Sequence, residues 1–321
     1  MNFLIGIDGG GTHSRLLAVR TDGTVIGAVT GSSTNVESNE AAVVRQNVLQ
    51  LLDELVSTYR VSLDDCAALC IGTAGVDTRS SRRKVEEMIE SFAINIPYKV
   101  VNDAVIGLYA NTQGNPGIML IAGTGSIAYG LNRKRDEWRV GGYGYMVSDE
   151  GSAYWVAKEG IARALKSGDR SGPPTRLADD FCKALGLGEI VAIMDFVYRA
   201  NKSDIASLSH LVTAAHKSGD DIAGLIMREA ADALCRLVLT VIEQLNMDDA
   251  PYPLLLGGGF LLACDWLMTE ILHGVREKYP LITTRKMLAK AEWGAVFMAA
   301  ELAGVRLPQQ DLDPSHLRFS Q

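Results

Sequence analysis

Cysteine is scarce in this sequence and follows no pattern. The 321 residues include five cysteines, and no two of them form a C-x-x-C pair. Zinc sites and disulfide scaffolds usually show paired cysteines at short, regular spacings. We therefore expect no zinc site and no disulfide among Cys66, Cys70, Cys182, Cys235 and Cys264.

Positive charge is also in deficit. The chain has 31 Lys and Arg residues against 38 Asp and Glu residues, which gives a formal net charge of −7 at pH 7. Binding to a nucleic acid or to an anionic membrane surface requires clustered Lys and Arg side chains. The sequence therefore predicts neither kind of partner.

Long apolar runs are missing as well. A membrane-spanning helix needs about 20 consecutive apolar residues, and the apolar stretches 116–132 and 251–264 are both interrupted by glycines and polar residues. The first residues lack the cationic start of a signal peptide. We expect a cytoplasmic protein, long enough for two domains of roughly 150 residues each.

What the sequence does contain is an abrupt transition from an apolar strand into glycines. Residues 3–7 are apolar and lead into Asp8, three glycines and Thr12. Glycine lets backbone N–H groups approach an anion closely. A carboxylate beside bound phosphates would be repelled unless a divalent cation lay between them, so Asp8 is predicted to be a Mg²⁺ ligand. The alternative is a glycine-rich hairpin turn with an Asp at a turn position.

The same transition recurs at residues 117–126 and again at 254–260. Around the first copy, strands at 3–8, 14–20 and 24–31 are predicted to form an antiparallel meander. Alternating strands and helices follow, which is typical of a mixed sheet with helical cover. We predict two copies of this α/β unit, with phosphate loops that face each other across a cleft. Neither loop has the lysine of a Walker motif, which excludes a P-loop NTPase.

Several segments carry a resemblance to a known superfamily. Residues 8–12, 123–126, 256–259 and the small-residue helix 291–303 resemble the phosphate, adenosine and connecting elements of the acetate/sugar kinase, Hsc70 and actin superfamily. Residues 141–155, with the sequence GGYGYMVSDEGSAYW, resemble the N-acetylglucosamine kinase branch of the BadF/BadG/BcrA/BcrD ATPase family. The resemblance covers nearly the whole chain.

This resemblance implies an α/β fold of the two-domain, actin-like ATPase (ribonuclease H-like) type. Each domain would be a mixed sheet with helical cover, and a cleft would lie between the domains. The small domain would comprise residues 1–114, with the last helix, about 289–305, packing back onto it. The larger domain would comprise residues 115–288.

The resemblance also implies an ATP- and Mg²⁺-dependent kinase that phosphorylates the 6-hydroxyl of N-acetylglucosamine and forms a homodimer. Glucosamine and N-acetylmuramic acid are alternative acceptors. An ATPase that activates a partner enzyme through a shared iron–sulfur cluster is a second class of function, but it needs thiolate ligands near the second phosphate loop. No cysteine lies between Cys70 and Cys182. A binding-only member coupled to DNA regulation ranks last, because the acidic chain has no added basic helix-turn-helix.

The family's site residues are carried over position by position. The resemblance assigns the adenosine to Gly257, Gly258 and Gly259. It assigns the ATP phosphates to Gly9, Gly10, Gly11, Thr12, Gly123, Thr124, Gly125 and Ser126. It assigns the amino sugar to Asn35, Asp103, Gly142, Tyr143, Asp149, Ser152 and Ala153.

Two carboxylates have alternative interpretations. Phosphoryl transfer to a sugar hydroxyl needs a carboxylate that orients the hydroxyl and takes its proton, and Asp103 matches the family's catalytic base. It also stands where a helix N-cap is expected, and both roles can coexist because a carboxylate has two oxygens. For Asp149, the alternative to sugar binding is a helix-start signal in residues 149–152.

Overall fold

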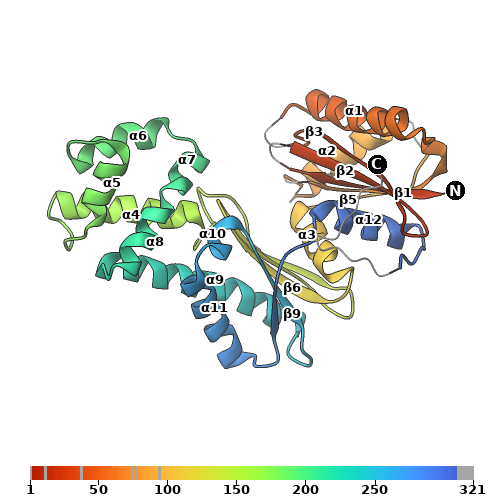
Figure 1. Ribbon diagram of the computed structural model, residues 1–321. Coiled ribbons are helices and arrows are strands. Elements are labelled where there is room, and N and C mark those ends of the chain that lie inside the picture. The colour runs from red at the N-terminus through yellow and green to blue at the C-terminus, as the bar shows by residue number, and fades with distance from the viewer. Residues whose placement is uncertain are drawn as a thin grey trace. The chain divides into compact units, whose positions relative to one another are not determined.

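The computed structural model divides into two compact units (Figure 1). Unit 1 contains the described residues up to Asn115 and those from Met287 onward, and unit 2 is Pro116–Lys286. Each unit has its own five-stranded sheet and its own core of buried apolar side chains. The residues that the structure describes are 2–10, 13–36, 39–73, 75–76, 78–92 and 95–308.

The sheet of unit 1 begins with the predicted meander. Strands β1, β2 and β3 pair antiparallel, while β4 and β5 extend the sheet from β1 by parallel pairing, in the order β3-β2-β1-β4-β5. This arrangement confirms the mixed sheet expected from the sequence. The strands are β1 (Phe3–Gly9), β2 (His13–Arg20), β3 (Val25–Ser32), β4 (Cys66–Thr73) and β5 (Tyr98–Val101).

Helices cover both faces of this sheet. Side chains alternate between the two faces of a strand, so Phe3, Ile5 and Ile7 all point to one side, where they join the core beneath α1 and α2. Helices α3 and α12 lie on the opposite face (Figure 1). The helices are α1 (Ala41–Tyr59), α2 (Arg79–Glu90), α3 (Asp103–Thr112) and α12 (Ala291–Leu302), with a 3₁₀ turn at Leu63–Asp65.

Small residues let α12 pack unusually close to its neighbours. A Cβ atom at Gly6 of β1 would lie 2.5 Å from the backbone nitrogen of Val296 in α12. A Cβ atom at Gly294 would overlap the backbone of Ile106 in α3. The small residues of α12 and of β1 therefore let the neighbouring backbones approach closely.

Unit 2 repeats the topology of unit 1. Strands β6, β7 and β8 form an antiparallel meander, and β9 and β10 extend the sheet from β6 by parallel pairing, in the order β10-β9-β6-β7-β8. The prediction of two copies of one α/β unit is confirmed by this match. The strands are β6 (Gly117–Ala122), β7 (Ser126–Leu131), β8 (Glu137–Gly141), β9 (Pro253–Gly257) and β10 (Thr283–Lys286).

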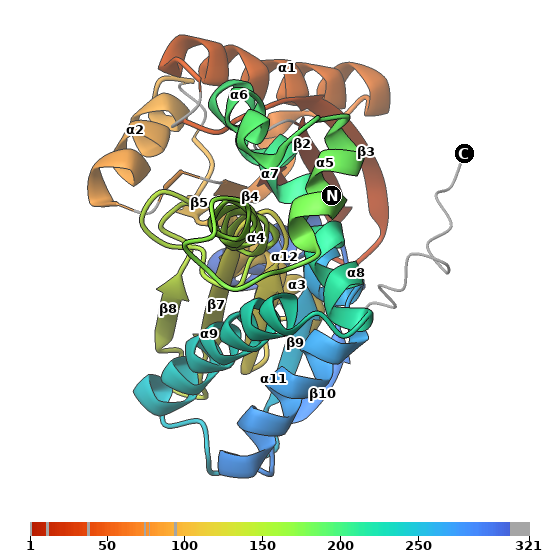
Figure 2. The same ribbon diagram turned by 90° about the vertical axis from the view of Figure 1, so that its left-hand side faces the viewer.

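A long helix, α9, covers the sheet of unit 2, and α11 packs along α9 (Figure 2). Gly130 of β7 leaves room for Val241 and Leu245 of α9, because a Cβ atom there would meet both side chains. Shorter helices fill the sequence between α4 and α9. The helices are α4 (Ala153–Gly168), α5 (Leu177–Leu185), α6 (Ile193–Arg199), α7 (Lys202–Ser207), α8 (Ser209–Lys217), α9 (Asp221–Leu245), α10 (Gly259–Leu262) and α11 (Asp265–Lys278), with a 3₁₀ turn at Ile190–Ala192.

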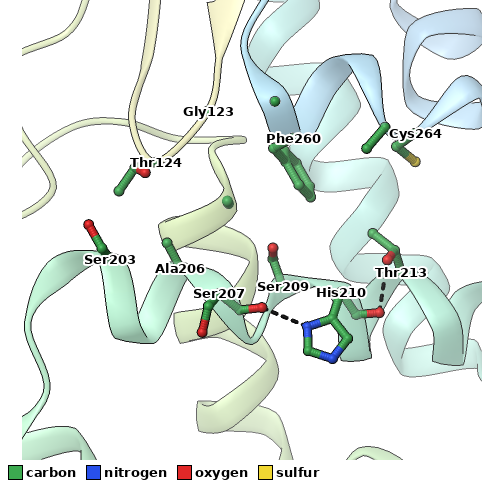
Figure 3. Close-up of a pocket in the computed structure, with 13 residues that line it drawn as sticks. Gly123, Thr124, Ser203, Ala206, Ser207, Ser209, His210, Thr213, Phe260 and Cys264 are labelled. Carbon is green, nitrogen blue, oxygen red and sulfur yellow. Dashed lines mark hydrogen bonds between the residues drawn. The ribbon is translucent and has the colours of Figure 1, made fainter.

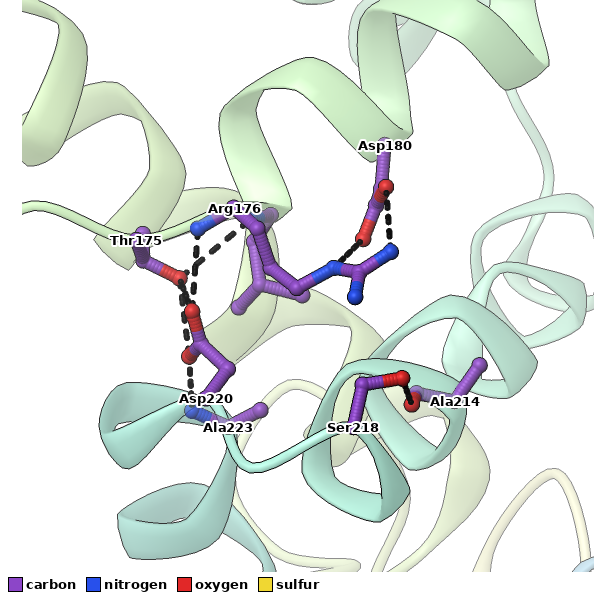
Figure 4. A network of polar contacts seen from close by, with 8 residues as sticks. Thr175, Arg176, Asp180, Ala214, Ser218, Asp220 and Ala223 are labelled. Atoms are coloured by element: carbon purple, nitrogen blue, oxygen red, sulfur yellow. Dashed lines mark hydrogen bonds and ion pairs between the residues drawn. The ribbon is translucent and has the colours of Figure 1, made fainter.

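A polar network at the start of α9 connects it to α5 (Figure 4). The Asp220 carboxylate accepts hydrogen bonds from the Thr175 hydroxyl at 2.9 Å, from the Arg176 backbone N–H at 2.9 Å and from the Ala223 N–H at 2.8 Å. Burial acts to raise the pKa of Asp220, but these hydrogen bonds outweigh burial and lower it. The ionised carboxylate therefore caps α9 and fixes the segment that leads into α5.

The described residues contain no helix that is long and apolar enough to cross a membrane. The five cysteines are free thiols, and each is buried or half-buried. Burial raises the pKa of Cys66 and Cys70 to about 12, so both remain protonated at neutral pH.

Candidate active site

The first glycine turn lies at the end of β1 in unit 1. The Gly10 N–H donates to the His13 carbonyl at 3.1 Å and closes the turn between β1 and β2. A Cβ atom at Gly9 would lie 2.7 Å from the Thr73 hydroxyl oxygen, so glycine is required there by close packing. The expected phosphate contacts of Gly11 and Thr12 fall outside the described residues.

Buried hydroxyl groups support this turn from behind. The Thr73 hydroxyl donates to the Gly9 carbonyl at 3.1 Å, and the Ser33 hydroxyl donates to the Gly10 carbonyl at 3.1 Å. The Asn35 backbone N–H in turn donates to the Ser33 hydroxyl at 3.2 Å. The structure therefore brings the predicted sugar ligand Asn35 to the same corner of unit 1 as the first glycine turn.

Asp8 lies in a field of negative charge. Burial, followed by the nearby carboxylates of Glu292 and Asp103, raises its pKa to about 6, while Arg15 acts in the opposite direction. Glu292 is itself buried, with 6% of its surface exposed. The ionised form of Asp8 is disfavoured unless a cation is nearby.

This arrangement fits a magnesium ion that is bound together with phosphates. Among the described residues, no three Asp, Glu, His or Cys side chains form a metal-binding group by themselves. Mg²⁺ does not require one, because it keeps several waters and is typically held by one or two carboxylates and the phosphates of the substrate. Asp8 at the glycine turn meets that requirement.

Replacing Asp8 with Asn should stabilise the protein in a pH-dependent way. Because the folded-state pKa is raised to about 6, above the unfolded value near 3.9, the folded state binds the proton more tightly, and stability falls as pH rises from about 4 to 6. We expect Asp8→Asn to be up to about 3 kcal/mol more stable than the parent at pH 8 without divalent ions, with no advantage at pH 4. Urea unfolding at both pH values measures this, and an equal gain at both would contradict it.

Asp103 follows β5 at the first position of α3. The N-cap is Asn102, which has an extended backbone and accepts a hydrogen bond from the Ala104 N–H at 2.9 Å. The alternative interpretation of Asp103 as the N-cap is therefore wrong by one residue. The strand β5 ends at Val101, and the cap is the residue that follows it. Asp103 still accepts a bond from the same N–H at 2.9 Å, which orients its carboxylate at the start of the helix.

The second glycine turn joins β6 to β7 and is bonded to the start of α4. The Ala153 N–H donates to the Gly123 carbonyl at 2.9 Å, and the Ser126 hydroxyl donates to the Glu150 carbonyl at 2.8 Å. The only hydroxyl hydrogen of Ser126 is thus used within the protein. The Ser152 hydroxyl accepts from the Trp155 N–H at 3.2 Å and caps α4, so a helix does begin after residues 149–152, and its cap is Ser152 instead of Asp149.

Asp149 is held against this second turn. Its side chain is 5% exposed, and its backbone φ of +70° lies in the left-handed region that non-glycine residues rarely adopt. A Cβ atom at Gly125 would lie 2.7 Å from Asp149 Oδ2. The structure therefore brings the predicted sugar ligand Asp149 together with the predicted phosphate ligand Gly125.

The third glycine turn lies beside the second. Gly258 has a φ of +94°, and a Cβ atom there would overlap the Ala122 carbonyl group. A Cβ atom at Gly123 would lie 3.9 Å from the Gly258 Cα atom. Around Gly259 the space is open, which is what a ligand approaching the backbone would need.

A cavity of 390 Å³ opens between these two turns and α7 and α8 (Figure 3). The Phe260 side chain projects from α10 toward α8 (Figure 3). His210 Nδ1 lies 2.6 Å from the Ser207 carbonyl oxygen. A cavity of this size, with apolar walls and a few polar groups, is typical of a small-molecule site. Its lining is Gly123, Thr124, Ala153, Ser203, Ala206, Ser207, Ser209, His210, Thr213, Gly259, Phe260, Ala263 and Cys264.

The loop after β8 carries the predicted ligands Gly142 and Tyr143. Gly142 has a φ of +72°, and Tyr143 is 66% exposed. The Arg139 guanidinium lies 4.9 Å from the centre of the Tyr143 ring, an arrangement typical of a cation–π contact. The role of this loop in sugar binding stays a prediction.

Two charged residues at the site were missed by the sequence analysis. Glu292 stands next to the buried apolar run 293–300 of α12, and an acid at that place is a signal that could have identified it. Lys202 lies in a run of amphipathic helices without a motif, and its Nζ atom is 3.0 Å from Asp149 Oδ2. Only the folded chain brings Glu292 near Asp8 in unit 1 and Lys202 onto Asp149 in unit 2.

The fold and this site place the protein in a defined class. Residues 5–299 match the BadF/BadG/BcrA/BcrD ATPase family, and the chain belongs to that family. The resemblance noted in the sequence is therefore confirmed.

The chain is similar in sequence to two named kinases. The chain is 34% identical to the N-acetylmuramic acid/N-acetylglucosamine kinase of Clostridium acetobutylicum, over 93% of this chain and 98% of the relative. It is 28% identical to the N-acetyl-D-glucosamine kinase of Dictyostelium discoideum, over 92% and 97%.

A solved structure supports the fold. A candidate N-acetylglucosamine kinase from Chromobacterium violaceum matches with a TM-score of 0.69 at 24% identity, covering 93% of this chain and 99% of that one. This likeness, together with the two matching mixed sheets, confirms the predicted two-domain α/β fold of the actin-like type.

Proposed function

We propose that this protein transfers the γ-phosphoryl group of ATP to the 6-hydroxyl of N-acetylglucosamine. One observation carries the proposal: in unit 2, two glycine turns and the buried Asp149 carboxylate converge beside a cavity of nucleoside size. Such turns suit phosphates, and a buried carboxylate suits sugar hydroxyls. The names of the relatives at 34% and 28% identity support an amino sugar as the acceptor.

The cavity is proposed to hold the adenosine of ATP. Phe260 offers an aromatic surface to the base, and the hydroxyls of Ser203 and Thr213 line the same space. Thr124 and Gly125 would bind phosphate oxygens by their backbone N–H groups, whereas the Gly123 N–H donates to the Gly125 carbonyl at 2.9 Å and holds the turn. Ser126 would contribute by its backbone, since its hydroxyl donates to Glu150.

Magnesium is proposed to accompany the nucleotide. Asp8 would hold it, directly or through water, and the ion would neutralise charge on the phosphates when bound. The buried negative charge around Asp8 supports a cation at this position.

The chain's own chemistry is proposed to centre on two carboxylates. Asp149, with Asn35, would orient the sugar by hydrogen bonds. Asp103 would accept the proton of the attacking hydroxyl as the new oxygen–phosphorus bond forms, the bond between the γ-phosphorus and the bridging oxygen breaks, and ADP leaves.

N-acetylmuramic acid is a second candidate acceptor, because it is part of the name of the relative at 34% identity. A coupled assay of ADP release with N-acetylglucosamine, N-acetylmuramic acid, glucosamine and glucose separates the candidates. We expect release to depend on an N-acetylated sugar and to be lost with the 6-deoxy analogue. ADP release that is the same with and without every sugar would overturn the kinase proposal and favour a partner-activating ATPase. The homodimer implied by the family stays a prediction.

A further inference from the structure

The ion pair between Lys202 and Asp149 lies at the glycine turn proposed to hold phosphates. Lys202 Nζ is 3.0 Å from Asp149 Oδ2, with side-chain exposures of 32% and 5%. The same oxygen would lie 2.7 Å from a Cβ atom at Gly125. Allowing for one carbon–carbon bond of about 1.5 Å, the ammonium group lies within about 7 Å of the Gly125 Cα atom.

The position of α7 also favours a role toward the cavity. Ser203, the residue after Lys202, lines the cavity together with Gly123 and Thr124, and Figure 3 draws Ser203 and Thr124 on the same side of it. Lys202 Nζ also lies 5.4 Å from the centre of the Tyr145 ring. One third of the lysine side chain is exposed, so its four-carbon stem is free to turn toward a ligand.

Phosphoryl transfer depends on cations that balance the charge of the phosphates. The glycine turns at 9–12 and 123–126 contain no lysine or arginine. We propose that Lys202 supplies a phosphate-binding cation at the second turn, and that Asp149 holds it there until the nucleotide and the sugar bind. The inference rests on the proposed function, since it takes ATP as the ligand.

The ion pair also predicts coupling between the two substrates. Lys202 occupies Oδ2 of Asp149 in this structure, so a sugar hydroxyl that binds at Oδ2 competes with the ammonium group for that oxygen. Sugar bound to Asp149 would release Lys202 toward the phosphates, and phosphates bound to Lys202 would free Asp149 for the sugar. Coupling of this kind is reciprocal, and typical values are about 5- to 150-fold in affinity.

The test compares Lys202→Met with the parent protein by calorimetry, using adenosine and the non-hydrolysable ATP analogue AMPPNP with Mg²⁺. We expect the variant to bind AMPPNP about 10- to 100-fold more weakly and adenosine unchanged, because only the analogue carries phosphates. Lys202→Arg should recover most of the AMPPNP affinity. Lys278→Met is the matched control, because it also removes the lysine of an ion pair in unit 2, and it should bind as the parent does.

The binding results distinguish a phosphate-binding lysine from one that only supports the structure. Equal loss of adenosine and AMPPNP affinity in both Lys202 variants would mean that the lysine only holds α7 in place, and unchanged AMPPNP affinity in Lys202→Met would also overturn the proposal. A parent protein that binds AMPPNP no better than adenosine would overturn the proposed function itself.

The coupling is tested by titrating AMPPNP with and without N-acetylglucosamine. The parent should bind AMPPNP more tightly with the sugar present, and Lys202→Met should lose that gain. A gain of the same size in both proteins would show that the sugar acts without releasing Lys202.

Discussion

Replacing Asp103 with Asn should reduce kcat by about 10²- to 10⁴-fold while the affinity for sugar and nucleotide stays close to that of the parent. The amide has nearly the shape of the carboxylate and can still accept the hydrogen bond that Asp103 takes from the Ala104 N–H. It cannot accept the proton of the attacking hydroxyl. The loss should therefore fall on turnover alone, and not on binding.

Steady-state kinetics together with calorimetric titration of the sugar separate the two quantities. Asp53→Asn is the matched control, because Asp53 is an exposed aspartate on α1 in the same unit, and its kinetics should not change. A parallel fall in sugar affinity and turnover in Asp103→Asn would mean that the carboxylate serves the local structure of α3 instead of proton transfer.

Gly294→Ala should destabilise unit 1 by about 3 kcal/mol, at the upper end of the usual cost of overpacking. The added Cβ atom would overlap the carbonyl of Ile106, and a backbone group cannot rotate away as a side chain can. Helices α3 and α12 would have to separate, which would also disturb the contact of α12 with β1 at Gly6.

Hydrogen–deuterium exchange in α3, α12 and β1, together with urea unfolding, measures this effect. Gly188→Ala is the control, because a Cβ atom at Gly188 meets no atom within 4 Å, and its stability should change by less than about 0.5 kcal/mol. Both variants lose the same chain freedom in the unfolded state, so the difference reports the packing of α12. Unchanged exchange in Gly294→Ala would contradict the close approach.

The regular parts of the fold were predictable because local sequence determines them. The apolar run 3–7 and the glycines after it define β1 and its turn, and the same pattern at 117–126 predicted the second sheet. The start of α3 was harder to place, because Asn102 and Asp103 are both good capping residues. Helix boundaries commonly vary by a residue or two, and the cap fell on Asn102.

The site was predictable only where one short segment carries it. Residues 149–153 follow a recognisable motif, and the structure places Asp149 beside Gly125. The partner of Asp149 comes from α7, 53 residues further along the chain, and no spacing rule links such positions. Glu292 likewise comes near Asp8 only because α12 packs on β1.

The discontinuous make-up of unit 1 has a consequence for synthesis on the ribosome. Its β1 strand is translated first, but α12, which covers one face of that strand, is translated only after all of Pro116–Lys286. At about 5 to 20 residues per second, the apolar face around Leu4 waits roughly 15 to 60 seconds for α12 to be made. Unit 2 is continuous and can fold during that interval, so the half of the molecule that is made first is completed last.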